Sequence, residues 1–168
     1  MINFLKTKLN LNKKKLYFIM FIVFIFISFY HLSLGYNMSS DSHRFSKWAD
    51  QLIELNFNFF DFYSIERADH RPHLFFFTIP VSSIALCKVF FVNEWQIAFL
   101  FLNLSLLLVS LIIFVNSLLL ARVKPILIFL SFPLIIISAD ILTWPRYMLS
   151  DMIYAFFVML ALYFIVKG

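Results

Sequence analysis

The chain has 168 residues, of which 62% are hydrophobic, with a formal net charge of +5 and a mean hydropathy of +0.90. This composition excludes an ordinary soluble domain and predicts an integral membrane protein. The basic residues do not form a single patch, so the positive charge does not predict nucleic acid as a partner.

The first 15 residues are predicted to be a basic cytoplasmic tail, because lysines before a first span indicate a cytoplasmic N-terminus. These lysines are Lys6, Lys8, Lys13, Lys14 and Lys15. Residues 16–35 form the first predicted transmembrane helix, since Leu16 to Leu34 carries no formal charge. A signal peptide is the alternative, with Ser33 and Gly35 near its cleavage site, but the usual apolar core of a signal is only about 7–15 residues.

Residues 36–94 follow and are predicted to be an outer loop, which is polar from Tyr36 to Pro72. Within it, Phe45, Trp48, Leu52 and Leu55 recur at helical spacing, which predicts an amphipathic helix in the membrane interface. The N-cap candidates for this helix are Ser39, Ser40, Asp41 and Ser42.

The end of this region is ambiguous, because Leu74 to Cys87 is apolar, contains Pro80 and runs into Lys88. A segment of this length favours an interfacial or re-entrant helix over a full span. The alternative is that residues 74–92 cross the membrane, which gives five spans.

The remaining chain predicts three more transmembrane helices with short connections. They are residues 95–120, a cytoplasmic turn at 121–124, residues 125–139, an outer loop at 140–151, and residues 152–168. Asn103 and Asn116 lie within the first of these helices and are predicted to hydrogen-bond to neighbouring helices.

The distribution of charge favours four spans over five. With four spans, Arg122, Lys124 and Lys167 join the N-terminal lysines on the cytoplasmic side, while Asp41 and Asp151 share the outer side. The predicted fold is therefore an all-α integral membrane protein of the cell membrane. It has about four transmembrane helices plus amphipathic interfacial helices in the first outer loop.

Three short motifs occur along this chain in a set order. They are Asp41 with Arg44-Phe45 and Ala49, then Arg71-Pro72-His73-Leu74-Phe75-Phe76, then Leu149-Ser150-Asp151-Met152-Ile153. Together with the order of segments, they resemble the N-terminal part of the GT-C superfamily of membrane glycosyltransferases. That superfamily includes protein mannosyltransferases, aminoarabinose transferases and oligosaccharyltransferases.

The resemblance implies transfer of a sugar from a polyprenyl-phosphate-linked donor to an acceptor on the non-cytoplasmic face, next to membrane lipid. It makes Asp41 the candidate catalytic base and Asp151 the second catalytic acid, positioning a metal or the acceptor. Helix capping is the alternative role for Asp41, and a favourable helix-start charge is the alternative for Asp151. The acceptor and the sugar are not specified by the sequence.

Side chains of the outer loop are candidates for contact with the donor phosphate and for a divalent metal cofactor. The phosphate candidates are Arg44, Arg67 and Arg71, because guanidinium matches phosphate oxygens; contact with lipid headgroups or with Glu66 and Asp69 is the alternative. The metal candidates are Asp69, His70 and His73, and an ordinary polar loop is the alternative.

The length of the chain predicts a fragment, because members of the superfamily continue with many more spans, and the fragment alone is expected to be too short for activity. The alternative function is a small non-enzymatic multi-span membrane protein, either an assembly subunit or a piece of a transporter. A transporter is expected to carry charges within its helices, whereas the carboxylates here cluster in loops.

Overall fold

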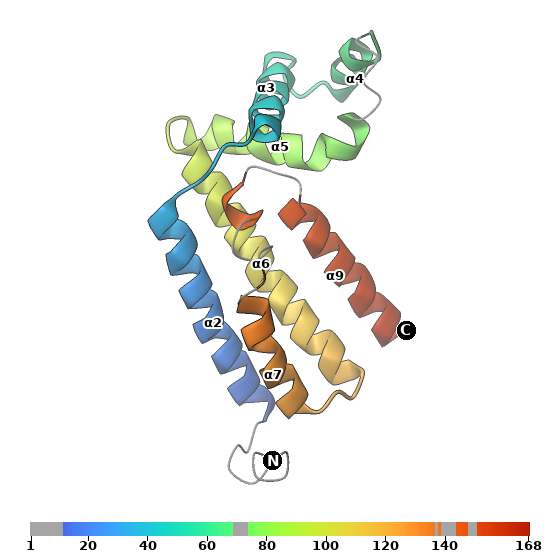
Figure 1. Ribbon diagram of the computed structural model, residues 1–168. Helices are drawn as coiled ribbons and strands as arrows, with labels where there is room; N and C mark the ends of the chain where they lie inside the picture. The colour runs from blue at the N-terminus through green and yellow to red at the C-terminus, as the bar shows by residue number, and fades with distance from the viewer. Residues whose placement is uncertain (1–11, 69–73, 137, 139–143, 148–150) are drawn as a thin grey trace.

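The computed structural model describes residues 12–68, 74–136, 138, 144–147 and 151–168 (Figure 1). This part of the chain is helical and contains no strand, only one isolated backbone bridge, so the prediction of an all-α fold is confirmed. The helices are α2 (Lys13–Leu34), α3 (Ser40–Glu54), α4 (Phe59–Ala68), α5 (Leu74–Phe91), α6 (Trp95–Leu120), α7 (Pro125–Ile136), the 3-10 helix η1 (Trp144–Arg146) and α9 (Asp151–Lys167).

The helices form two layers that meet end to end (Figure 1). Helices α2, α6, α7 and α9 run lengthwise beside one another, and we call them the bundle. Helices α3, α4 and α5 lie at one end of it, with α5 placed crosswise, and we call them the cap. The segment predicted to be interfacial therefore forms a continuous helix, α5, with Pro80 inside it.

Helix α2 begins and ends at local sequence signals. The Asn12 side chain accepts a hydrogen bond from the Lys15 backbone N–H at 3.0 Å, which satisfies one of the donors left open at a helix start. At the other end Gly35 has φ +68° and ψ −172°, a conformation that is almost restricted to glycine, and the helix stops there.

The core of the bundle collects apolar side chains from all four of its helices. They are Leu16, Met20, Val23 and Ile27 of α2, Leu107, Leu111 and Val115 of α6, Ile128 and Phe132 of α7, and Met152 of α9. The outward faces are also apolar: Phe18, Phe26 and Phe29 of α2 are 65%, 71% and 71% exposed. An apolar outer surface of this kind requires lipid or protein around it.

The cap has its own core, built around the amphipathic helix that the sequence predicts. Phe45, Trp48 and Leu52 are buried on one face of α3 and pack with residues of α5, Phe62 of α4 and Phe99 of α6. The fourth predicted member of that face, Leu55, is half-buried at the helix end. The predicted periodicity of α3 is thus confirmed.

A largely buried lysine fastens α3 to α5. The Lys88 ammonium of α5 donates to the Ser46 carbonyl oxygen at 3.0 Å, to Ser46 Oγ at 2.8 Å and to Asp50 Oδ1 at 2.6 Å. It also lies 4.7 Å from the ring centre of Trp95, where α6 begins. All three donors of the ammonium are therefore used within the cap, which suits a lysine that is mostly withdrawn from water.

Two helices, α2 and α6, are long and apolar enough to cross a membrane. Helix α7 has 12 residues and α9 has 17, so both are shorter than a usual span of about 20. The fold thus provides two candidate spans by length and composition. The shorter helices α7 and α9 run alongside them.

Candidate functional site

Asp41 lies in the first turn of α3, on the outside of the cap. Ser39, not Asp41, caps this helix: its hydroxyl oxygen accepts a hydrogen bond from the Ser42 backbone N–H at 3.1 Å. The capping role considered for Asp41 is therefore filled by a neighbour. The Asp41 side chain is 55% exposed, so its carboxylate is accessible from solvent.

Arg44 is the one predicted phosphate-binding residue whose side chain the structure describes, and it lies beside Asp41. Its Nη2 is 3.6 Å from Asp41 Oδ1, and its guanidinium is 6.0 Å from the centre of the Trp48 ring. Both charged side chains are more than half exposed, and an exposed pair of this kind contributes little to stability. The structure therefore places Asp41 and Arg44 side by side, and both charged side chains remain accessible to solvent.

Asp151 lies on a different element, at the start of α9, and its side chain is half-buried. A carboxylate in the first turn is favoured by the positive end of the helix dipole. Asp41 and Asp151 share the cap end of the molecule, but α3 packs on α5 whereas α9 packs on α6 and η1. Asp41 thus lies in the cap and Asp151 in the bundle. The contacts between the cap and the bundle therefore determine their relative position.

The other predicted site residues are placed only in part. Arg67 is in α4, but the structure does not describe its side chain, and Arg71, Asp69, His70 and His73 lie outside the described residues. Among the side chains that are described, no three His, Cys, Asp or Glu residues approach closely enough to hold a metal ion. These described side chains therefore do not fit a divalent metal.

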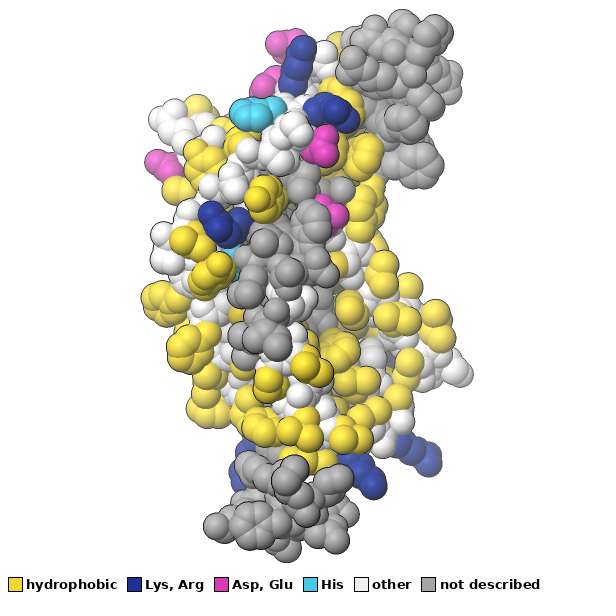
Figure 2. All heavy atoms as spheres, viewed as in Figure 1, with side chains coloured by type: hydrophobic (Ala, Val, Ile, Leu, Met, Phe, Trp, Pro, Cys, Tyr) yellow, Lys and Arg dark blue, Asp and Glu magenta, His cyan; other side chains and the backbone are white. Residues whose placement is uncertain are grey.

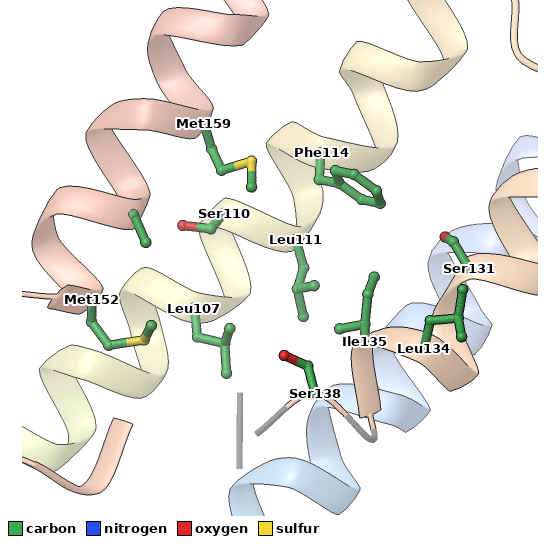
Figure 3. A pocket seen from close by; sticks show the side chains of 11 residues that line it. Leu107, Ser110, Leu111, Phe114, Ser131, Leu134, Ile135, Ser138, Met152 and Met159 are labelled. Atoms are coloured by element: carbon green, nitrogen blue, oxygen red, sulfur yellow. The ribbon is translucent and has the colours of Figure 1, made fainter. Parts of the chain in front are cut away.

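An apolar groove of about 320 Å³ lies between α6, α7 and α9 (Figure 3). Its side chains are Leu107, Ser110, Leu111 and Phe114 of α6, Ser131, Leu134 and Ile135 of α7, Ser138, and Met152, Ala155 and Met159 of α9. Met152 directly follows Asp151, so the cap end of the groove lies next to the second predicted acid. The lining is suited to a hydrocarbon chain.

A polar junction that the sequence did not predict joins the segment between α2 and α3 to η1 and α6. Arg146 Nε donates to the Gly35 carbonyl oxygen at 3.0 Å, and the Asn37 backbone N–H donates to the Arg146 carbonyl oxygen at 2.9 Å. Asn103 Nδ2 of α6 donates to the Pro145 carbonyl oxygen at 3.2 Å and to that of Tyr147 at 3.3 Å. We call residues 34–37, 145–147 and Asn103 the junction.

The roles predicted for the two asparagines of α6 are confirmed. Asn103 is 1% exposed and bonds to the chain around η1, and Asn116 accepts a hydrogen bond from the Tyr17 hydroxyl of α2.

The sequence also contains weaker signals for the two cations whose contacts were not predicted. Lys88 is a lone cation in an apolar segment, and Arg146 is a lone cation in the last polar break, so each needed a partner from elsewhere in the chain.

The charges separate along the length of the molecule. Lys13, Lys14 and Lys15 open α2, and Arg122 and Lys124 follow α6, all at the end of the bundle away from the cap. In Figure 2 the carboxylates visible on this face lie in the cap half, and the charged side chains visible at the opposite end are basic. This distribution gives the bundle a basic end and an end that carries acids.

No protein-family model matches the chain, and no curated protein or solved structure is significantly similar to it.

Proposed function

We propose that this chain is the N-terminal part of a membrane glycosyltransferase, which moves a sugar from a polyprenyl-phosphate-linked donor to an acceptor on the non-cytoplasmic face. The observation that carries the proposal is the position of Asp151, at the cap end of the apolar groove and directly before Met152 in its wall. A lipid-linked sugar needs an apolar path for its tail and charged groups at one end of that path. The groove supplies the path and Asp151 supplies a charged group beside it, while Asp41 and Arg44 lie in the cap, which covers the same end of the bundle.

In this proposal α2, α6, α7 and α9 all cross the cell membrane, and the cap lies at the outer interface. The N-terminus is cytoplasmic, because the basic end of the bundle then obeys the positive-inside bias. The crosswise position of α5 supports an interfacial rather than a spanning role. The shorter helices α7 and α9 would be accommodated by local thinning of the bilayer or by flanking residues.

This orientation is tested by cysteine labelling in intact cells. A cysteine at Asn93 is expected to react with a membrane-impermeant maleimide, whereas a cysteine at Arg122 reacts only after the cells are permeabilised. The background is Cys87→Ala; burial raises the pKa of the native Cys87 thiol, so that thiol is a poor nucleophile near neutral pH in any case. Labelling of position 122 in intact cells would contradict the proposed orientation.

The proposed reaction is a single displacement with inversion. The Asp41 carboxylate takes the proton of the acceptor hydroxyl while that oxygen attacks the anomeric carbon of the sugar. The bond between the anomeric carbon and the phosphate oxygen breaks, and its electron pair leaves with the lipid phosphate. Arg44, 3.6 Å from Asp41, stabilises the charge that develops on the phosphate, and Asp151 orients the acceptor.

The test compares Asp41→Asn with Asp61→Asn, which changes an exposed carboxylate of α4 within the same cap. Membranes expressing the chain within its complete reading frame are supplied with radiolabelled polyprenyl-phosphate sugars. Loss of the base is expected to lower transfer about 100-fold in Asp41→Asn. Asp61→Asn should transfer at the native rate.

Equal transfer by the native protein and Asp41→Asn would remove Asp41 from the reaction. Absence of transfer from the folded native protein, with every sugar supplied, would contradict the proposed function. The predicted alternative, a small non-enzymatic membrane protein that is either an assembly subunit or a piece of a transporter, would then be favoured.

A further inference from the structure

Arg146 closes the end of α2. Its Nε donates to the Gly35 carbonyl oxygen at 3.0 Å and its Nη2 to the Leu34 carbonyl oxygen at 3.4 Å. The last carbonyls of a helix have no partner within the helix, and they carry the negative end of its dipole. A half-buried guanidinium at this point both satisfies those carbonyls and compensates their charge.

The backbone on either side of Arg146 runs beside the linker that leads to α3. Asn37 and Tyr147 form a parallel bridge, in which the Asn37 N–H donates to the Arg146 carbonyl oxygen at 2.9 Å. The Asn37 side-chain amide also donates to the Tyr147 hydroxyl at 3.1 Å. Two segments more than 100 positions apart are therefore held in one register by backbone and side-chain bonds together.

Asn103 attaches this pair of segments to α6. Its amide nitrogen is shared between the Pro145 and Tyr147 carbonyl oxygens, and the side chain is 1% exposed. Hydrogen bonds withdrawn from water in this way specify one arrangement more strictly than apolar packing does. The junction thus fixes the linker, the chain around η1 and α6 relative to one another.

The two predicted catalytic acids lie at matching distances along the chain from this bridge. Asp41 follows Asn37 by four positions and Asp151 follows Tyr147 by four positions, and the two segments run in the same direction. The bridge therefore precedes each of the two acids by the same number of positions. Any change in its register would move the start of α3 relative to the start of α9.

We infer that Arg146 is a positioning residue, which sets the relative placement of the helices that carry Asp41 and Asp151. The catalytic meaning of this inference rests on the proposed function, whereas the geometric part does not. Arginine is required because its planar fork reaches two successive carbonyl oxygens, Gly35 and Leu34, at once. Lysine, a point charge on a flexible stem, does not fix both.

The geometric part is tested with pairs of nitroxide labels in lipid nanodiscs, in the Cys87→Ala background. One label replaces His43 on α3 and the other Val158 on α9, both exposed positions. The native protein is expected to give one narrow distance distribution between them. In Arg146→Gln, and in Arg146→Lys, a second population should appear and the distribution should broaden.

The control pair joins α6 and α9, with labels at the exposed Ser105 and at Val158. These helices pack directly on one another, so their distance distribution should be the same in all variants. If the distance distribution between labels 43 and 158 is the same in Arg146→Gln as in the native protein, the inference is overturned. Broadening of both pairs would also overturn it, because Arg146 would then support the whole bundle rather than the placement of α3.

A second variant keeps Arg146 intact. Asn37 lies at an exposed position, and Asn37→Ala removes its bond to the Tyr147 hydroxyl. This variant should broaden the distance distribution between labels 43 and 158, but less than Arg146→Gln does.

In the transfer assay, Arg146→Gln should lower kcat about 10- to 100-fold with little change in the donor KM, as misplacement of reacting groups does. If the proposed function is wrong, no variant transfers sugar, and the label distances still decide the geometric part.

Discussion

Replacing Phe62 by alanine is expected to release α4 from the cap, at a cost of about 3–5 kcal/mol in the free energy that holds it there. Phe62 is 1% exposed and is the side chain of α4 that enters the cap core. Removing the ring leaves a cavity in the cap core, besides the lost burial. The bond between the Tyr63 and Thr78 hydroxyls then remains to hold α4 against α5.

The chain supplies a matched control two positions away. Phe60 lies on the same helix but is 88% exposed, so Phe60→Ala removes an equal volume and no packing inside the protein. Hydrogen exchange of the α4 amides measures the difference, since 1.4 kcal/mol corresponds to about a tenfold change in local opening. Exchange should become at least about 100-fold faster in Phe62→Ala and stay near native in Phe60→Ala; equal exchange in the two variants would show that Phe62 does not anchor α4.

Replacing Lys88 by alanine is expected to loosen α3 from α5 by about 3 kcal/mol. Charge-assisted hydrogen bonds contribute about 1.5–3 kcal/mol, and the contact with the Trp95 ring and the buried methylenes add to this. Asp50 is 56% exposed and returns to water after the change, which limits the penalty. The Ser46 carbonyl oxygen loses its bond to the ammonium, which adds to the cost.

Lys47→Ala is the matched control, because Lys47 is exposed on the same surface helix, α3. Exchange of the α3 amides should quicken about 100-fold in Lys88→Ala and hardly at all in Lys47→Ala. Lys88→Met separates packing from charge: it keeps the methylenes and should recover only the smaller part of the loss. Full recovery by methionine would mean that the polar bonds of Lys88 contribute nothing to the cap.

The parts of the fold that the sequence predicted well are those determined by nearby residues. The face of α3 follows from the spacing of Phe45, Trp48 and Leu52, and its start follows from a serine side chain that can reach a backbone N–H two or three positions on. The long apolar stretch of α6 likewise forms a helix over the predicted residues, Trp95–Leu120. Such signals operate within a few turns and need no knowledge of distant segments.

The packing inside the bundle was not predictable in the same way. In α2 the inward residues Leu16, Met20 and Val23 are no more apolar than the outward Phe18 and Phe26, so no polar stripe marks the outer face. Periodicity therefore fails to identify the buried side. The number of helices that cross a membrane stays a prediction for a related reason: length and composition select only α2 and α6.

The junction was not predictable because its partners are far apart in the chain. Arg146 meets the carbonyl oxygen of Gly35 across 111 positions, and no local pattern marks either residue as belonging with the other. Asp41 shows the opposite case, in which a local pattern allowed two roles. Capping was one of them, and the structure assigns it to Ser39, so that Asp41 keeps an exposed carboxylate beside Arg44.

The spread of the two cores along the chain has a consequence for biosynthesis. Every buried residue of the cap core lies between Phe45 and Phe99, whereas the bundle core needs residues up to Met152 and the junction needs Arg146. Because a nascent chain emerges from its N-terminus onward, the cap can close while α7 and α9 are still unmade. The carbonyl oxygens at the end of α2 receive their bonds from Arg146 only after residue 146 has been made. A ribosome stopped before residue 146 would therefore carry a folded cap, with the segment between α2 and α3 not yet bonded to η1.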